Sequence, residues 1–130
     1  MTYFENSLGG KVVVCTYLFP NSIQFEAKRL QWSNLMDHAI SGGLPVKVEA
    51  QHKITPVMRK NGRGDCILML TNMTYDSVSR FSAVVDAENL KAVSANGEFM
   101  PVESEKLAGG KTRIWIDGLE PWESIVLVNC

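Results

Sequence analysis

The first apolar run of the chain predicts a strand. Residues 11–19 read KVVVCTYLF, and Gly9 and Gly10 precede them. A run without polar alternation is typical of a strand that is covered on both faces. Pro20 ends the run, because proline restricts the residue before it to an extended conformation. We therefore expect a doubly covered strand that begins at the glycine pair.

The next segment predicts a helix. Asn21 and Gln24 have the spacing of a capping box, and Gly42 with Gly43 would stop a helix that runs to about Ser41. At 3.6 residues per turn this helix has two apolar stripes. They consist of Phe25, Trp32, Met36 and Ala39 on one side and of Ile23, Ala27 and Leu30 on the other. Two stripes suggest contact with two layers, and the second layer need not belong to this chain.

The rest of the chain alternates short apolar segments with turn signals such as Asn96-Gly97 and Asp117-Gly118. The expected strands are residues 46–50, 54–59, 66–72, 78–85, 90–95, 99–103, 111–117 and 124–129. Many short strands at this spacing indicate an antiparallel sandwich. The predicted fold class is α+β, with a strand–helix segment (1–43) followed by an immunoglobulin-like β-sandwich (44–130). We expect the two parts to form one compact module.

For three of these strands the sequence pattern also predicts which faces are covered. Residues 66–70 and 125–128 are apolar at every position, so we expect both strands to be central and covered on both sides. The strand at 111–117 alternates instead, with Arg113, Trp115 and Asp117 on the face opposite Ile114 and Ile116. Trp115 therefore lies on the polar face.

Length and charge narrow the class of protein. A chain of 130 residues fits one domain, which buries roughly two-thirds of its unfolded surface. The 13 basic and 14 acidic side chains form no basic run, which argues against nucleic acid and anionic membrane as partners. The apolar runs are also shorter than the ~20 residues of a membrane span.

The start of the chain lacks the basic and apolar regions of a secretory signal. We expect a cytoplasmic protein if the chain stands alone, and a periplasmic or secreted one if it belongs to an exported parent. Cysteines 15, 66 and 130 are interpreted as buried or terminal free thiols rather than as disulfide or metal ligands.

No residue pattern predicts catalysis, a cofactor or a metal site. The 14 carboxylates are scattered, and the two histidines have no cysteine or carboxylate at ligand spacing. The residues around Gly9 and Gly10 match neither common phosphate-binding motif. Arg63-Gly64-Asp65 fits a hairpin turn, and Asn72-Met73-Thr74 fits a glycosylation acceptor only in an exported eukaryotic protein.

The aromatic residues suggest a different possibility, a platform on which a sugar stacks. Trp32 and Trp122 are interpreted as core residues. Trp115 is the candidate, with Arg113 and Asp117 beside it; the alternative is that Trp115 packs against a neighbouring segment or domain. For Trp122 we expect a position on one face with Ser124, Val126 and Val128, where it closes the end of the core.

Two stretches resemble a known family. Residues 5–14, ENSLGGKVVV, are similar to the EN-x-LGG-[RK]-V-x-V segment late in large bacterial glycoside-hydrolase-like proteins related to family 42 β-galactosidases. In those proteins the segment leads into the end of a glutamine-amidotransferase-like domain. Residues 119–128 resemble the L-x-PWE-x-x-V-L ending of the small β-domain that closes such chains.

The resemblance implies structural roles only. The catalytic carboxylates of that family lie on a (β/α)8 barrel of ~250 residues, which this chain cannot contain. No catalytic residue is carried over. The carried-over positions are Gly9 and Gly10 at a strand entrance, and Pro121 with Trp122 at the final strand.

The expected function is that of a non-catalytic C-terminal accessory module, which stabilises, orients or assembles the catalytic part of a parent protein. The strand–helix segment would contact that part or a second copy of the chain. Two alternatives remain: a carbohydrate-binding module that uses Trp115, and a small enzyme with an unrecognised site.

Overall fold

The computed structural model describes residues 2–14 and 25–129. The chain divides into two compact units, Met1–Leu44 and Pro45–Cys130. Antiparallel sheets make up most of the described structure, together with one α-helix, so the fold is α+β as predicted.

The first unit begins with a hairpin of β1 (Thr2–Glu5) and β2 (Lys11–Val14). The Asn6 side chain shapes its turn by accepting hydrogen bonds from the backbone N–H groups of Leu8 and Gly10. Gly9 has φ +80°, which glycine adopts without strain. The glycine pair therefore precedes a strand as expected, but this strand pairs with β1, which the sequence pattern did not predict.

The expected cover on both faces of β2 is wrong for its described part, because Val12 and Val14 are exposed. An apolar strand is stabilised when both of its faces are buried. In a two-stranded hairpin the strand pairs at one backbone edge only, and this pairing buries neither face. Residues 15–19 of the predicted strand lie outside the described residues.

Helix α1 (Glu26–Ala39) follows. The predicted capping box at Asn21 lies outside the described part of the chain. The helix ends two residues before the predicted Ser41, and the Asp37 carboxylate then accepts a 2.7 Å hydrogen bond from Leu44 N–H. The Tyr3 and His38 rings meet edge to face with centroids 4.6 Å apart. Within the described residues, no helix has the length and apolarity needed to span a bilayer.

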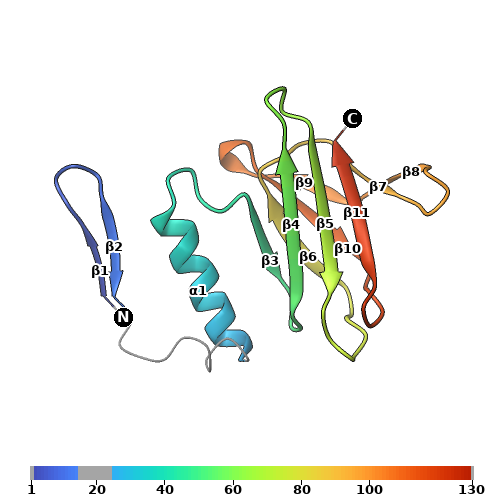
Figure 1. Ribbon diagram of the computed structural model, residues 1–130, viewed down its shortest axis with the longest axis horizontal. Coiled ribbons are helices and arrows are strands. Elements are labelled where there is room, and N and C mark those ends of the chain that lie inside the picture. The colour runs from blue at the N-terminus through green and yellow to red at the C-terminus, as the bar shows by residue number, and fades with distance from the viewer. Residues whose placement is uncertain (1, 15–24, 130) are drawn as a thin grey trace. The chain divides into compact units, whose positions relative to one another are not determined.

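The second unit contains two antiparallel sheets (Figure 1). The four-stranded sheet has the order β3-β6-β10-β9 and the five-stranded sheet has the order β4-β5-β11-β7-β8. The strands of the first are β3 (Val46–Glu49), β6 (Phe81–Val85), β10 (Thr112–Ile116) and β9 (Ser104–Lys106). Those of the second are β4 (Ile54–Lys60), β5 (Cys66–Asn72), β11 (Ser124–Asn129), β7 (Leu90–Val93) and β8 (Phe99–Pro101).

The two sheets share one hydrophobic core, which makes this unit a β-sandwich. The five-stranded sheet contributes Leu68, Leu70 and Leu127, and the four-stranded sheet contributes Ala83, Val85 and Ile114. The predicted bounds of β5 and β11 are confirmed. The predicted strand 78–85 starts later, at Phe81, and Val78 forms only an isolated bridge to Leu119. Beyond the end of β8, the polar strand β9 was not predicted.

Strands β5 and β11 are central, as predicted, and β4, β5 and β11 lie side by side (Figure 1). The expected cover on both sides is wrong: Leu68 is fully buried, whereas its neighbour Ile67 is 55% exposed. Leu127 pairs with Leu68 on the core face, and Val128 pairs with Ile67 on the outer face. The predicted inward direction of Val126 and Val128 is therefore also wrong, because a strand that is apolar throughout does not reveal which alternate set faces inward.

Candidate functional site

The predicted ligand site lies on the outer face of the four-stranded sheet. Arg113 and Trp115 belong to β10, where they are paired with Val84 and Ser82 of the neighbouring strand β6. On the other side, Arg113 is paired with Glu105 of β9. Trp115 is partly buried. The alternation of β10 thus places both side chains on one face, as predicted.

Carboxylates from neighbouring strands surround Arg113. Its guanidinium nitrogens lie 3.7 Å from Glu49 and 3.9 Å from Glu105. The Ser82 hydroxyl donates a 3.0 Å hydrogen bond to the same Glu49 carboxylate. The Arg113 Nε is buried and has no hydrogen-bond partner among the described residues. The charge of Arg113 is therefore directed at these carboxylates rather than presented to a ligand.

Asp117 does not join this group. It follows the end of β10, its side chain is 99% exposed, and its carboxylate lies 3.9 Å from Arg80 Nε. Arg80 also pairs closely with Glu103. The structure therefore brings together Trp115 and Arg113, while Asp117 belongs to a separate surface ion pair.

A second aromatic group lies on two loops, between β5 and β6 and between β10 and β11. We call Tyr75 and Trp122 the aromatic corner. Their ring centroids are 5.6 Å apart and the ring planes meet at 82°. Tyr75 is 85% exposed and Trp122 is 54% exposed. The prediction that Trp122 closes the end of the core is therefore wrong.

The backbone at Trp122 explains why the prediction failed. Trp122 has φ +62°, and the backbone N–H of Glu123 donates a 3.0 Å hydrogen bond to Glu120 C=O. Proline at the second position and positive φ at the third are features of a type II turn, which favours glycine at the third position. A left-handed conformation costs a non-glycine residue about 1–2 kcal/mol. The turn reverses the chain before β11, so strand alternation does not extend back to Trp122, and Pro121 lies in the turn.

Asn72 holds the two loops together. It is fully buried, and its Nδ2 donates hydrogen bonds to the carbonyl oxygens of Asp76, Leu119 and Glu120 at 2.9–3.2 Å. Its Oδ1 accepts hydrogen bonds from the backbone N–H and the hydroxyl of Thr74. Asn72 is thus a structural link, and its engaged amide nitrogen cannot receive a glycan in the folded chain. The sequence marks this residue only through its acceptor tripeptide.

The surroundings of the aromatic corner are polar and acidic. The loops 73–80 and 117–123 include four carboxylates and one basic side chain, Arg80, which is engaged by Asp117 and Glu103. The Ser77 hydroxyl donates a 2.6 Å hydrogen bond to the Glu120 carboxylate, which joins the loops a second time. The Glu123 carboxylate accepts a 2.7 Å hydrogen bond from Glu120 N–H.

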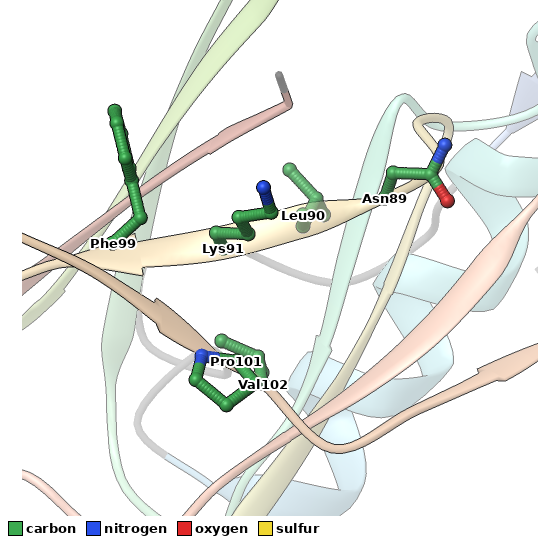
Figure 2. A pocket seen from close by; sticks show the side chains of 6 residues that line it. All are labelled: Asn89, Leu90, Lys91, Phe99, Pro101 and Val102. Atoms are coloured by element: carbon green, nitrogen blue, oxygen red, sulfur yellow. The ribbon is translucent and has the colours of Figure 1, made fainter.

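A pocket of about 510 Å³ lies on β7, β8 and the adjoining residues. Figure 2 shows the side chains that line it. The residues that line it are Asn89, Leu90, Lys91, Phe99, Pro101 and Val102. Lys91 is its one charged residue, and the ammonium lies 5.9 Å from the centre of the Phe99 ring. This lining combines an apolar surface with a single cation and brings no acid–base pair together.

A smaller pocket of about 250 Å³ is lined in part by Lys60, Asp65 and Cys66. Burial raises the pKa of the Cys66 thiol, with a smaller opposing effect from Lys60. The thiol is therefore protonated at neutral pH and a weak nucleophile. Cys66 is free and buried, as predicted, whereas Cys15 and Cys130 lie outside the described residues.

Among residues 2–14 and 25–129, no three His, Cys, Asp or Glu side chains lie together in a way that could hold a metal ion. The chain matches no protein-family model, no curated protein and no solved structure.

Proposed function

We propose that the chain is a non-catalytic accessory module of a larger glycoside-hydrolase-like protein. In this proposal its hairpin and helix α1 pack against the catalytic part of that protein or against a second copy. The observation that carries the proposal is the exposure of apolar side chains throughout the first unit. They are Phe4, Leu8, Val12, Val14, Phe25, Met36 and Ile40, and α1 has no buried residue.

Such a unit gains little stability from its own contacts. An isolated hairpin is marginal in water, and so is a helix shorter than about 12–15 residues. In most proteins a helix is stabilised by the packing of an apolar face, and burial of one large apolar side chain contributes about 1.5–3 kcal/mol. A partner surface that covers Phe25 and Met36 would supply this missing packing.

We also infer that the β-sandwich is of the immunoglobulin-like type. Two features support this: the two antiparallel sheets enclose one core, and the chain crosses between the sheets at five connections, β3–β4, β5–β6, β6–β7, β8–β9 and β10–β11. An experimental structure whose strands did not superpose on those of immunoglobulin domains would contradict the immunoglobulin-like type, but it would not contradict the β-sandwich architecture.

The accessory role is tested with the full chain by light scattering over a concentration series and by binding of a dye specific for exposed apolar surface. We expect self-association or strong dye binding, and we expect the double change Phe25→Glu and Met36→Glu to reduce it. Asn34→Glu, on an exposed position of the same helix, adds a charge without removing apolar surface and is the matched control. A monomeric chain that binds no dye, with α1 amides as protected from hydrogen exchange as those of β5, would overturn the proposal.

A further inference from the structure

The aromatic corner has the features of a binding site for a flat, uncharged ligand. We propose that Tyr75 and Trp122 bind a neutral carbohydrate through stacking of a sugar ring on the exposed aromatic surface. This inference does not depend on the accessory role, because it concerns different residues and a different ligand.

The first argument is the fixed position of the corner. Trp122 N–H donates a 3.0 Å hydrogen bond to Asn72 C=O, and Asn72 N–H donates a 2.9 Å bond to Glu123 C=O. The Asn72 side chain adds its own bonds to both loops. Because the backbones that carry the two rings are tied to one buried residue, a ligand would meet a surface that is already ordered.

The second argument is the exposure of Trp122. A tryptophan occupies a turn position that favours glycine, yet more than half of its surface is exposed. The core therefore gains little from this indole. An indole offers an apolar face together with an N–H donor, and a sugar ring presents C–H groups on one face and hydroxyls at its rim.

The third argument is the charge of the surroundings. The loops that carry the corner have four carboxylates and one basic side chain, Arg80, which Glu103 and Asp117 already engage. The excess of negative charge disfavours phosphorylated or uronic-acid ligands. The Ser77 hydroxyl holds the Glu120 carboxylate in place, and the Glu120 N–H holds the Glu123 carboxylate. The remaining lone pairs of these carboxylate oxygens can accept hydrogen bonds from sugar hydroxyls.

A cation is the main competing ligand, since carboxylates and aromatic rings both attract it. Cation–π attraction is strong where the cation loses its water, and weak at exposed sites. Tyr75 and Trp122 form an open corner of two rings, so a bound cation would keep most of its hydration. Stacking of a sugar ring does not require enclosure, and the geometry favours it.

The other aromatic candidates are less available. Trp115 is partly buried beside an arginine that two carboxylates already engage. The ammonium of Lys91 lies over the Phe99 ring. The aromatic corner therefore replaces Trp115 as the surface that fits a sugar.

The test uses the full chain labelled with nitrogen-15 and follows by NMR the indole N–H signals of its three tryptophans together with the backbone amide signals, which report binding in variants that lack the Trp122 indole. The probes are hexasaccharides of β-1,4-glucose, β-1,4-xylose, β-1,4-mannose and β-1,4-galactose, with hexagalacturonate and tetramethylammonium as charged comparisons. Trp122→Gly suits the positive φ and removes the indole, so it separates binding from folding. Its missing signal also assigns the Trp122 indole.

We expect at least one neutral hexasaccharide to shift the Trp122 indole signal, and hexagalacturonate to leave it unchanged. Trp122→Gly and Tyr75→Ala should each weaken binding at least about tenfold. Phe99→Ala, which removes an exposed aromatic ring elsewhere, should leave the affinity unchanged.

Three results would overturn the proposal. The first is the absence of any shift with the neutral sugars up to about 10 mM, a limit that already corresponds to very weak binding. The second is sugar binding that survives Trp122→Gly. The third is a shift with tetramethylammonium and with no sugar, which would make the corner a cation site.

Discussion

At the scale of single residues, Gly118 occupies a place where a side chain does not fit. It has φ +145°, and a Cβ atom there would lie 2.7 Å from the carbonyl oxygen of Val78. Val78 and Leu119 exchange two backbone hydrogen bonds at this point, so the backbone cannot move away without breaking them.

We expect Gly118→Ala to lower the free energy of unfolding by about 2 kcal/mol or more, since it adds a steric clash to an unfavourable φ. Urea denaturation measures this loss. Gly62→Ala is the control, because nothing lies within 4 Å of its Cβ position, and we expect a change below about 0.5 kcal/mol. Equal losses in the two variants would contradict the assignment.

Cys66 predicts a dependence of stability on alkaline pH. Burial raises the pKa of its thiol above the value in the unfolded chain, so the unfolded state loses the proton first. The contribution to stability is complete below the ordinary thiol pKa of about 8.5 and is lost as the pH rises through the folded value. The measurement is urea unfolding from about pH 7 to pH 10 in the wild type and in Cys66→Ala, where the variant corrects for the other titrating groups. A difference between the two that stays constant over this range would refute the prediction.

At the scale of elements, β5 separates the two faces of the five-stranded sheet. Leu68 faces the core and Ile67 the outside, one residue apart. Leu68→Ala should cost about 2–5 kcal/mol, because it leaves a cavity in a packed core, and Ile67→Ala should cost less than about 1 kcal/mol. Thermal or urea unfolding decides between them. Comparable losses would mean that the outer face is covered as tightly as the core.

The sequence predicted elements where apolar runs are bounded by turn residues, as in β5 and β11. It did not predict β9, because Ser104, Glu105 and Lys106 carry no apolar signal and the strand depends on pairing with β10. The sequence predicts one strand over residues 99–103, but in the structure β8 ends at Pro101. Short-range sequence patterns cannot reveal such edge strands, because these strands form through pairing with a neighbouring strand that is distant in the sequence.

The sequence likewise predicted one part of the candidate site and did not predict another. Alternation along β10 placed Arg113 and Trp115 on one face, because that strand is regular. The aromatic corner depends on contacts across 47 and 48 residues, from the Asn72 amide to Leu119 and Glu120. Spacing along the chain contains no signal for such contacts, and the sequence pattern at Pro121 and Trp122 predicts the start of a strand where the structure has a turn.

At the scale of the whole molecule, the second unit has its own core. Every residue of the buried cluster, from Ile54 to Leu127, belongs to Pro45–Cys130. We therefore expect the fragment 45–130 to fold and to unfold in one cooperative transition. Circular dichroism and urea denaturation test this. Ile114→Asp in the same fragment should abolish the transition, because it buries an unpaired charge. An unfolded wild-type fragment would show that residues 1–44 are required.

The strand order described above also limits how this protein can polymerise. The five-stranded sheet ends in β4 and β8, which contain Pro56 and Pro101. The four-stranded sheet ends in β9, with two charged residues of three, and in β3, which Pro45 precedes. Proline offers no N–H to an incoming chain, and charged edge residues oppose its docking. Growth of fibres by strand addition is therefore disfavoured at each border, and assemblies of this unit are left to form through sheet faces and loops.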